Sequence, residues 1–582
     1  MTIPLTDPFP TQTSKRQPDA PRTPRRSAPP MTQPQEMKTK TYVCGVEKLN
    51  GYDAWALFEA CARGDVPKVK ALLAKDRRLV NAQFWYRFPI HMAVFVGHAE
   101  VVKLLLDQGA DPGQSVYTYD SWDKLLLCAR ERGYARIESL LHRAMQKRFN
   151  YTADFEVLRE AIIARDSRKI GAVLRRQPNL ARASDALGNT ALHWSVITRQ
   201  LDLIERFVEL GTPIDVQRAD GQSPVLLAVN GAMDYWYRAT RGKSHPSLRN
   251  TSVMVGSLLA RGAKYTISVA AAVGDQERVE ALLRKDPGLA RRLDSARISP
   301  LSYAAREGHL HIVRRLLEHG ADPNTPEDAA PHGRALFEAC CANHLQVAEL
   351  LLHHGADPNA GTDSNGCCLT ICEVCHGDQA RPLQELLRRH GAYTPCYAMS
   401  AQAMKEAIRD GHEVIPHEEF LGCVIAKRDS ELLDLYLDSP QTVPEHIGLW
   451  SGAYPGSPAL VRRLLACGLD PKRPDWLGQT FLHLCAKNGD RSVAAVLLDA
   501  GADINAREVE FRGTPLAAAV RSCFDGQDRK QAERGRRVIK FLLKGGAATN
   551  FPGDEPWATP LAWARTRGLK DIEEMLVKHG AH

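Results

Sequence analysis

The residues with the clearest chemical potential form the run Cys372-Glu373-Val374-Cys375-His376. Its C-x-x-C-H spacing formally matches c-type haem attachment. Further thiols and an imidazole lie close by in the sequence, so a zinc cluster is a second interpretation; these are Cys367, Cys368, His390 and Cys396.

A third interpretation of the same cysteines is helix packing. His376 directly precedes Gly377, which the spacing marks as a turn glycine, so both cysteines would lie on the preceding helix. Equivalent small-residue positions elsewhere in the chain are also cysteines, namely Cys61, Cys340 and Cys485. Haem attachment would also need an export signal, and the sequence contains none. We therefore favour core packing and expect neither a metal ion nor another cofactor.

Other catalytic patterns are missing from the sequence. We find no phosphate-binding G-x-x-x-x-G-K, no H-E-x-x-H, no nucleophile elbow and no dinucleotide fingerprint. Carboxylates such as Glu59 and Glu338 are interpreted as solvated helix faces. We expect no catalytic residues and predict that the protein is not an enzyme.

Composition describes an ordinary folded chain of unusual length. Its 582 residues are 44% hydrophobic and 25% charged, with a formal net charge of +8 and fourteen dispersed cysteines. Such a length exceeds one conventional core, and the charge is too small for a dedicated nucleic-acid binder. Dispersed cysteines favour reduced thiols, and no apolar run reaches membrane-spanning length. We expect a soluble, cytoplasmic protein.

The first forty residues differ from the rest. Residues 1–40 are rich in Pro, Thr, Ser, Gln and Arg and have almost no periodic apolar positions, so we expect a disordered tail. The run Pro21-Arg22-Thr23-Pro24-Arg25-Arg26 has the spacing of a polyproline-II ligand. A solvated tail is favoured over a docking peptide.

The remaining chain repeats itself. Leu57-Phe58-Glu59-Ala60-Cys61 recurs letter for letter as Leu336-Phe337-Glu338-Ala339-Cys340. A Gly-Ala-Asp loop follows the apolar cluster of several units, beginning at Gly109, Gly320, Gly355 and Gly501. Neighbouring loop glycines lie 33 to 35 residues apart. Such a period indicates a stack of repeated supersecondary units.

Helix-start signals complete each unit. Thr514-Pro515-Leu516, Thr559-Pro560-Leu561, Ser299-Pro300-Leu301 and Thr190-Ala191-Leu192-His193 place a capping residue before the first helix. Proline at that point loses no helix hydrogen bond, and the loop glycine ends the second helix in a left-handed conformation. From about Asp53 to His582 the chain resembles the ankyrin-repeat family. The resemblance implies an all-α solenoid of roughly fifteen helix–turn–helix units with hairpin-like connecting loops, in which His193 is structural.

Three places depart from the family pattern. An insertion is expected at about 231–250, another, basic one at about 525–537, and a degenerate or additional helical segment at 393–456. The expected division is therefore a tail at 1–40, an array at 41–392, the segment 393–456 and a second array at 457–582. The middle segment is where the stack would kink or split.

The family resemblance implies protein partners bound across a concave groove lined by the first helices. In the second unit, Phe95-Val96 stands before the turn glycine where polar residues are usual, and Ile197 takes the matching position later. The preceding loop carries Trp85 and Tyr86, and clustered aromatic residues commonly anchor interfaces. We predict that these five residues bind a partner, although insertion loops covering them, or packing of Phe95 between units, is the alternative.

The equivalent groove positions become basic toward the C-terminus, at Arg306, Lys487-Asn488, Arg521 and Arg567. The favoured function is a protein-binding scaffold or adaptor whose partner is unidentified. The alternative function is binding of nucleic acid or another anionic surface through the basic C-terminal units and the tail. Added salt separates the two, because phosphate binding weakens steeply with ionic strength.

Overall fold

The repeat motifs correspond to helix pairs in the computed structural model, which describes residues 29–111, 122–230, 251–362, 366–410, 418–439, 456–523, 529–550 and 555–582. First helices stack on first helices along the chain, and second helices stack on second helices. Four short strands form two antiparallel pairs, β1 (Tyr42–Cys44) with β2 (Glu47–Leu49) and β3 (Gly361–Thr362) with β4 (Gly366–Cys367). The structure is therefore a mostly helical solenoid, as the sequence predicts.

The first helices of the units begin at the capping signals or their equivalents. They are α1 (Gly51–Arg63), α3 (Pro89–Val96), α5 (Trp122–Glu131), α7 (Phe155–Ile163), α9 (Ala191–Ile197), α11 (Pro224–Asn230), α14 (Ile267–Val273), α16 (Pro300–Arg306), α18 (Ala335–Cys341), α20 (Cys368–His376), α23 (Glu418–Lys427), α26 (Phe481–Lys487), α28 (Pro515–Ser522) and α30 (Pro560–Thr566).

The second helices run back along the outer side of each unit. They are α2 (Val66–Lys75), α4 (Ala99–Asp107), α6 (Ala135–Phe149), α8 (Ser167–Arg176), α10 (Leu201–Glu209), α13 (Thr251–Ala260), α15 (Gln276–Lys285), α17 (Leu310–Glu318), α19 (Leu345–His353), α21 (Arg381–Arg389), α24 (Ser430–Leu437), α25 (Pro458–Ala466), α27 (Arg491–Asp499), α29 (Arg529–Lys544) and α31 (Lys570–Lys578). A further helix, α22 (Ala401–Arg409), packs on α24. Short 3-10 helices lie at η1 (Gln35–Met37), η2 (Arg77–Asn81), η3 (Pro178–Arg182), η7 (Pro287–Arg291) and η8 (Gly377–Ala380).

Local chemistry explains where these helices start and stop. The Thr514 hydroxyl accepts the backbone N–H of Ala517 at 3.3 Å, and Pro515 takes the first helical position. This arrangement satisfies one of the unpaired N–H groups at a helix start. At the other end, Gly320 and Gly355 have φ of 81° and 80°, the left-handed conformation that terminates a helix without a Cβ penalty.

The buried apolar side chains of the described residues form four clusters. The longest extends from Phe155 to Leu387, and a separate cluster begins at Met404 and extends to Ala502. A third covers the C-terminal units between Ala486 and Ala581. The apolar core is therefore divided between α21 and α22, inside the segment that the sequence singled out as degenerate.

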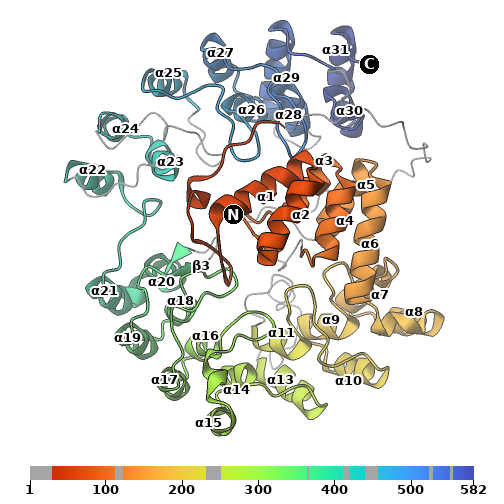
Figure 1. Ribbon diagram of the computed structural model, residues 1–582, viewed down its shortest axis with the longest axis vertical. Helices are drawn as coiled ribbons and strands as arrows, with labels where there is room; N and C mark the ends of the chain where they lie inside the picture. The colour runs from red at the N-terminus through yellow and green to blue at the C-terminus, as the bar shows by residue number, and fades with distance from the viewer. Residues whose placement is uncertain are drawn as a thin grey trace.

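The fourth cluster joins the two ends of the chain. It contains the first three helix pairs, from Met37 to Phe149, together with Leu477 and Val509 from the connecting loops of the C-terminal units. Figure 1 shows the result: the helix pairs follow one another around a ring, and α1, α3 and α5 lie beside α28 and α30. The solenoid closes on itself.

Packed structure begins before the expected boundary at residue 40. Met37 in η1 is fully buried, and Thr32 donates its hydroxyl to the carbonyl of Pro474 at 2.7 Å. The tail that lies outside the described residues therefore covers 1–28, and the segment from Thr32 contacts a C-terminal loop. Residues 231–250 and 524–528, which belong to the two expected insertions, also lie outside the described residues. Among the helices that the structure describes, none is both long enough and apolar enough to cross a membrane.

Candidate partner-binding surface

The loop before α3 ends in a tight hairpin with aromatic residues at its tip. Phe84 and Arg87 exchange backbone hydrogen bonds of 3.0 and 2.9 Å, leaving Trp85 and Tyr86 as the two central residues. Both have positive φ, 47° and 62°. A two-residue turn of this hand normally uses Asn-Gly, because bulky residues are strained in the left-handed region. The chain thus holds two aromatic residues in a costly conformation.

The five residues predicted to bind a partner occupy different environments. Trp85 is 41% exposed, and Tyr86 is half-buried. Phe95 and Val96, by contrast, are only 4% and 9% exposed, and Ile197 is 0% exposed. The first four lie in adjacent parts of one repeat, whereas Ile197 belongs to the separate cluster that begins at Phe155. Ile197 therefore has no side-chain surface left for a partner in this structure.

Phe95 is covered by an arginine that in turn contacts the other end of the chain. The Arg132 guanidinium lies 5.5 Å from the Phe95 ring centroid, and its Nη1 donates to the Phe95 carbonyl at 2.7 Å. The same guanidinium is 4.3 Å from the ring centroid of Trp557 and 5.8 Å from that of Phe511. C-terminal aromatic side chains thus pack on the same guanidinium that covers Phe95.

An ion pair and a ring contact extend this closure. Arg87 Nη2 lies 3.2 Å from Glu510 Oε1, and both side chains are less than a fifth exposed. Phe84 packs edge-on against Trp476 at a centroid distance of 5.2 Å. Partly buried ion pairs are screened less than surface pairs, so this contact adds to the apolar one.

Two of the basic groove positions toward the C-terminal end are also covered. The Arg521 guanidinium lies 3.4 Å from the Phe511 ring centroid and contacts Glu508 at 3.9 Å. Arg306 donates to the Asn230 side chain at 2.8 Å. Lys487 stays exposed. The expected change from an apolar to a basic groove stays a prediction, and Arg306 and Arg521 are the two basic positions that the structure shows in contact with other side chains.

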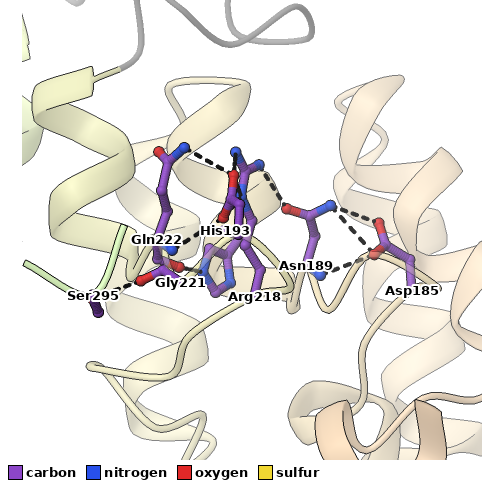
Figure 2. Close-up of polar contacts among 8 residues, drawn as sticks. Asp185, Asn189, His193, Arg218, Gly221, Gln222 and Ser295 are labelled. Carbon is purple, nitrogen blue, oxygen red and sulfur yellow. Dashed lines mark hydrogen bonds and ion pairs between the residues drawn. The ribbon is translucent and has the colours of Figure 1, made fainter. Parts of the chain in front are cut away.

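Buried polar side chains tie neighbouring connecting loops together, as Figure 2 shows. Asn189 donates to Asp185 at 3.1 Å, and Arg218 donates to Asn189 at 3.1 Å. The Arg218–Asp220 ion pair, at 2.8 Å, is almost completely buried. A buried charge is stable only when it is paired and hydrogen-bonded, so these residues fix the loops and leave no free group for chemistry.

His193 belongs to the same network and has the structural role that the resemblance implies. Its Nδ1 accepts the Thr190 backbone N–H at 3.2 Å, which leaves Nε2–H to donate to the Gln222 carbonyl at 3.1 Å. Burial, with Arg218 close by, lowers the pKa of His193 to about 3. The imidazole is therefore neutral, and both of its ring nitrogens are hydrogen-bonded. Ser295, one loop further, donates to the carbonyl of Gly221 at 2.7 Å.

A second buried network was missed by sequence reasoning. Glu338, expected on a solvated face, is 3% exposed and accepts a hydrogen bond from Arg334 at 3.2 Å. Arg334 also pairs with Glu327, which accepts the Ser302 hydroxyl at 2.7 Å. Burial raises the pKa of Glu327 to about 7. Arg334 stands four residues before Glu338, a spacing that brings side chains together on a helix and could have identified the pair.

The cysteine run lies on α20, as the packing interpretation requires, but only part of it is core. Cys372 is fully buried and donates to the Cys368 carbonyl at 3.0 Å, whereas Cys375 is exposed, 3.8 Å from the thiol of Cys341. The Nε2 of His376 bonds the Cys341 carbonyl at 2.8 Å. Within the described ranges, no group of three or more His, Cys, Asp or Glu side chains has the geometry to hold a metal ion.

Comparison with known proteins agrees with this architecture. The family model described as ankyrin repeats (3 copies) matches residues 41–153, 267–362 and 449–528. Helix pairs, hairpin-like loops and this match together make the chain an ankyrin-repeat protein. Ankyrin repeats indicate protein–protein interaction, so the class of partner is a protein.

Similar curated proteins share segments of this chain. Ankyrin repeat domain-containing protein 39 of Homo sapiens is 38% identical over 10% of this chain and 33% of its own length. The E3 ubiquitin-protein ligase KEG of Arabidopsis thaliana is 22% identical over 69% of this chain and 19% of its own. Palmitoyltransferase ZDHHC13 of Mus musculus is 24% identical over 24% of this chain and 22% of its own. The chain thus spans between about a fifth and a third of these relatives.

Proposed function

We propose that this protein is a non-catalytic scaffold or adaptor that binds a partner protein through the aromatic hairpin tip, with Trp85 and Tyr86 as its anchors. The observation that carries the proposal is the conformation of these two residues. Each left-handed non-glycine residue costs on the order of 1–3 kcal/mol, and both sit at the tip of one loop with Trp85 41% exposed.

Strain of this kind persists only where the surrounding structure enforces it. Phe84 and Arg87, on either side of the tip, are held by Trp476 and Glu510 of the C-terminal loops. The ring closure therefore fixes the base of the hairpin and presents its tip in one orientation. A pre-oriented aromatic anchor loses little entropy on binding, which favours affinity.

The buried residues of the prediction take a supporting role in this proposal. Phe95 and Val96 lie beneath the hairpin and would act by holding it, because so little of either side chain is exposed. The fourteen cysteines, all free thiols, fit a reducing compartment such as the cytoplasm, where we place the protein.

The experiment compares capture of cellular proteins by wild type, Trp85→Ala and Leu210→Ala. Leu210 is also 41% exposed but lies at the end of α10, so it controls for loss of exposed apolar area. Truncating a central anchor costs about 2 kcal/mol, or roughly thirtyfold in affinity. A protein retained by wild type and Leu210→Ala but lost from Trp85→Ala supports the proposal.

Equal capture by all three proteins would reject the hairpin tip as the anchor. Repeating the capture across a salt series addresses the alternative function. Binding that disappears with added salt and is insensitive to Trp85→Ala would favour nucleic acid or another anionic surface.

A further inference from the structure

Within the basic insertion expected at about 525–537, residues 529–537 form a helical wall. These residues are the first turns of α29, which spans 16 residues, whereas the neighbouring second helices α27 and α31 span nine each. These additional turns approach the connection between α26 and α27. Gln531 donates to the Asn488 carbonyl at 3.3 Å, and a Cβ on Gly489 would come within 2.8 Å of Arg534 Cβ.

A pocket opens between this wall and the two preceding second helices. Its volume is about 930 Å³, and its lining comes from the starts of α25 and α27 and from α29. Four arginines line it, Arg462 from α25, Arg491 from α27, and Arg534 and Arg537 from α29. We call these four side chains and the space between them the arginine pocket. Its volume suits a small-molecule ligand.

The charge of the arginine pocket is largely uncompensated. Arg462, Arg491 and Arg534 form no ion pair with any residue in the described ranges, and Arg537 reaches Glu533 only at 3.8 Å. The carboxylate in the lining, Asp490, already accepts the Val493 N–H at 3.1 Å as the cap of α27. Four solvent-exposed arginine side chains from three helices therefore line one space, in which Asp490 is the one carboxylate of the lining.

The remaining lining suits an anion as well. α27 begins at the pocket and presents the positive end of its dipole. The guanidinium of Arg491 lies 5.5 Å from the Phe541 ring centroid, a contact that orients it. Arginine binds phosphate with paired, charge-assisted hydrogen bonds, and four arginines exceed what a single phosphate group can engage.

We infer that the arginine pocket is a binding site for a small polyanion carrying two or more phosphate groups. Such a group is supplied by a free polyphosphate compound or by the headgroup of a phosphorylated phosphoinositide. The site lies on the second helices of the C-terminal units, away from the hairpin tip at Trp85, so it is independent of the proposed partner-binding function.

Isothermal titration calorimetry of the full chain with inorganic tripolyphosphate tests the inference. Arg534→Gln with Arg537→Gln is compared with Lys540→Gln and Lys544→Gln, which removes the same charge from the same helix outside the pocket lining. We expect wild type and the lysine variant to bind within about twofold of each other. The arginine variant should bind tripolyphosphate at least about tenfold more weakly, because it loses charge-assisted hydrogen bonds, which are stronger than hydrogen bonds between neutral groups.

Two further arms identify the source of the phosphates. Sedimentation with phosphatidylcholine vesicles containing phosphatidylinositol 4,5-bisphosphate, reversed by tripolyphosphate, would assign a lipid headgroup. Tripolyphosphate binding without vesicle binding would assign a free compound. The inference is overturned if tripolyphosphate does not bind wild type at low ionic strength, if both variants lose affinity equally, or if a polyglutamate peptide competes as well as tripolyphosphate.

Discussion

The guanidinium of Arg132 lies 4.3 Å from the ring centroid of Trp557. Arg132 belongs to the third helix pair, whereas Trp557 lies in the loop that leads into the last helix pair. Arg132 also covers the ring of Phe95 and bonds its carbonyl. One cationic side chain thus connects the first repeats with the last. An open ankyrin stack contacts only its neighbours in sequence, so this contact makes the two ends depend on each other.

The first prediction measures that dependence with a double-mutant cycle on the full chain. Arg132→Gln and Trp557→Leu should show a coupling energy of about 1–2 kcal/mol, the range for a desolvated cation–π contact. Denaturant unfolding of wild type, both single variants and the double variant gives the value. Arg136, which is on α6 and is more than half exposed, provides the control: Arg136→Gln with Trp557→Leu should be additive. A coupling below about 0.3 kcal/mol for Arg132 would mean that the ends are not joined in solution.

Phe95 should behave as a core residue. Its side chain is 4% exposed between the guanidinium groups of Arg87 and Arg132, so Phe95→Ala leaves a cavity. We expect the free energy of unfolding of the N-terminal repeats to fall by about 3–5 kcal/mol. Trp85→Ala, at the exposed hairpin tip, should cost less than about 1 kcal/mol. Hydrogen exchange of the α3 amides reports both values, and equal effects would contradict the burial of Phe95.

Gly221 should be intolerant of any side chain. It has φ of 80°, and a Cβ there would overlap the carbonyl oxygen of Ser295 in the next connecting loop. Gly355 has the same φ of 80° and no heavy atom within 4 Å of its Cβ position. Gly355→Ala should therefore lower the free energy of unfolding only by the cost of placing a Cβ in the left-handed conformation, about 1–2 kcal/mol. Gly221→Ala should cost measurably more, because the loops must move apart, and thermal unfolding of the two variants compares the costs directly. Equal losses would show that the loop contact contributes nothing.

The buried histidines should make the protein sensitive to acid. Burial lowers the pKa of His193 to about 3 and that of His483 to about 4, from an ordinary value near 6.5. Between these values the unfolded chain binds protons that the folded chain does not, so the free energy of unfolding falls as the pH drops below about 6.5. Each histidine contributes a slope of about 1.4 kcal/mol per pH unit. Denaturant titrations between pH 4 and 8 measure it.

Replacing these histidines should flatten the acid dependence. The double variant His193→Gln with His483→Gln should have a lower free energy of unfolding than wild type at pH 8, but that free energy should fall less on acidification. His354→Gln, at the exposed end of α19, should show the same pH dependence as wild type. Glu327, whose pKa is raised to about 7, acts in the opposite direction between about pH 4.5 and 7. Each variant is therefore compared with wild type at the same pH. Parallel curves for all variants would contradict a neutral, buried role for the two histidines.

The sequence predicts the repeat architecture because its signals are local. Thr514-Pro515 starts α28, and Gly320 and Gly355 end their helices in the left-handed conformation, all within one repeat. Met92, Trp194 and Tyr303, each on the first helix of a repeat, are buried in the structure. Each of these features depends on neighbours a few residues or one period away.

The covering of Phe95 could not be predicted in the same way. Arg132, which covers the Phe95 ring, is brought against Phe511 by the accumulated curvature of the whole stack, which no single motif encodes. The sequence did indicate unusual aromatic residues at Trp85, Tyr86 and Phe95, and the structure assigns them different environments. Glu338 shows a smaller omission, since its partner Arg334 stands only one helical turn earlier.

Closure of the ring also has a consequence for synthesis of the chain. Arg87 and Glu510 are 423 residues apart, and at about 5–20 residues per second the ribosome needs roughly 20 to 80 s to make the residues between them. The first repeats emerge and fold long before Trp476, Phe511 and Trp557 exist. During that interval Phe84 and Arg132 lack these ring partners, so the nascent protein passes through an intermediate that exposes apolar surface buried in the finished one.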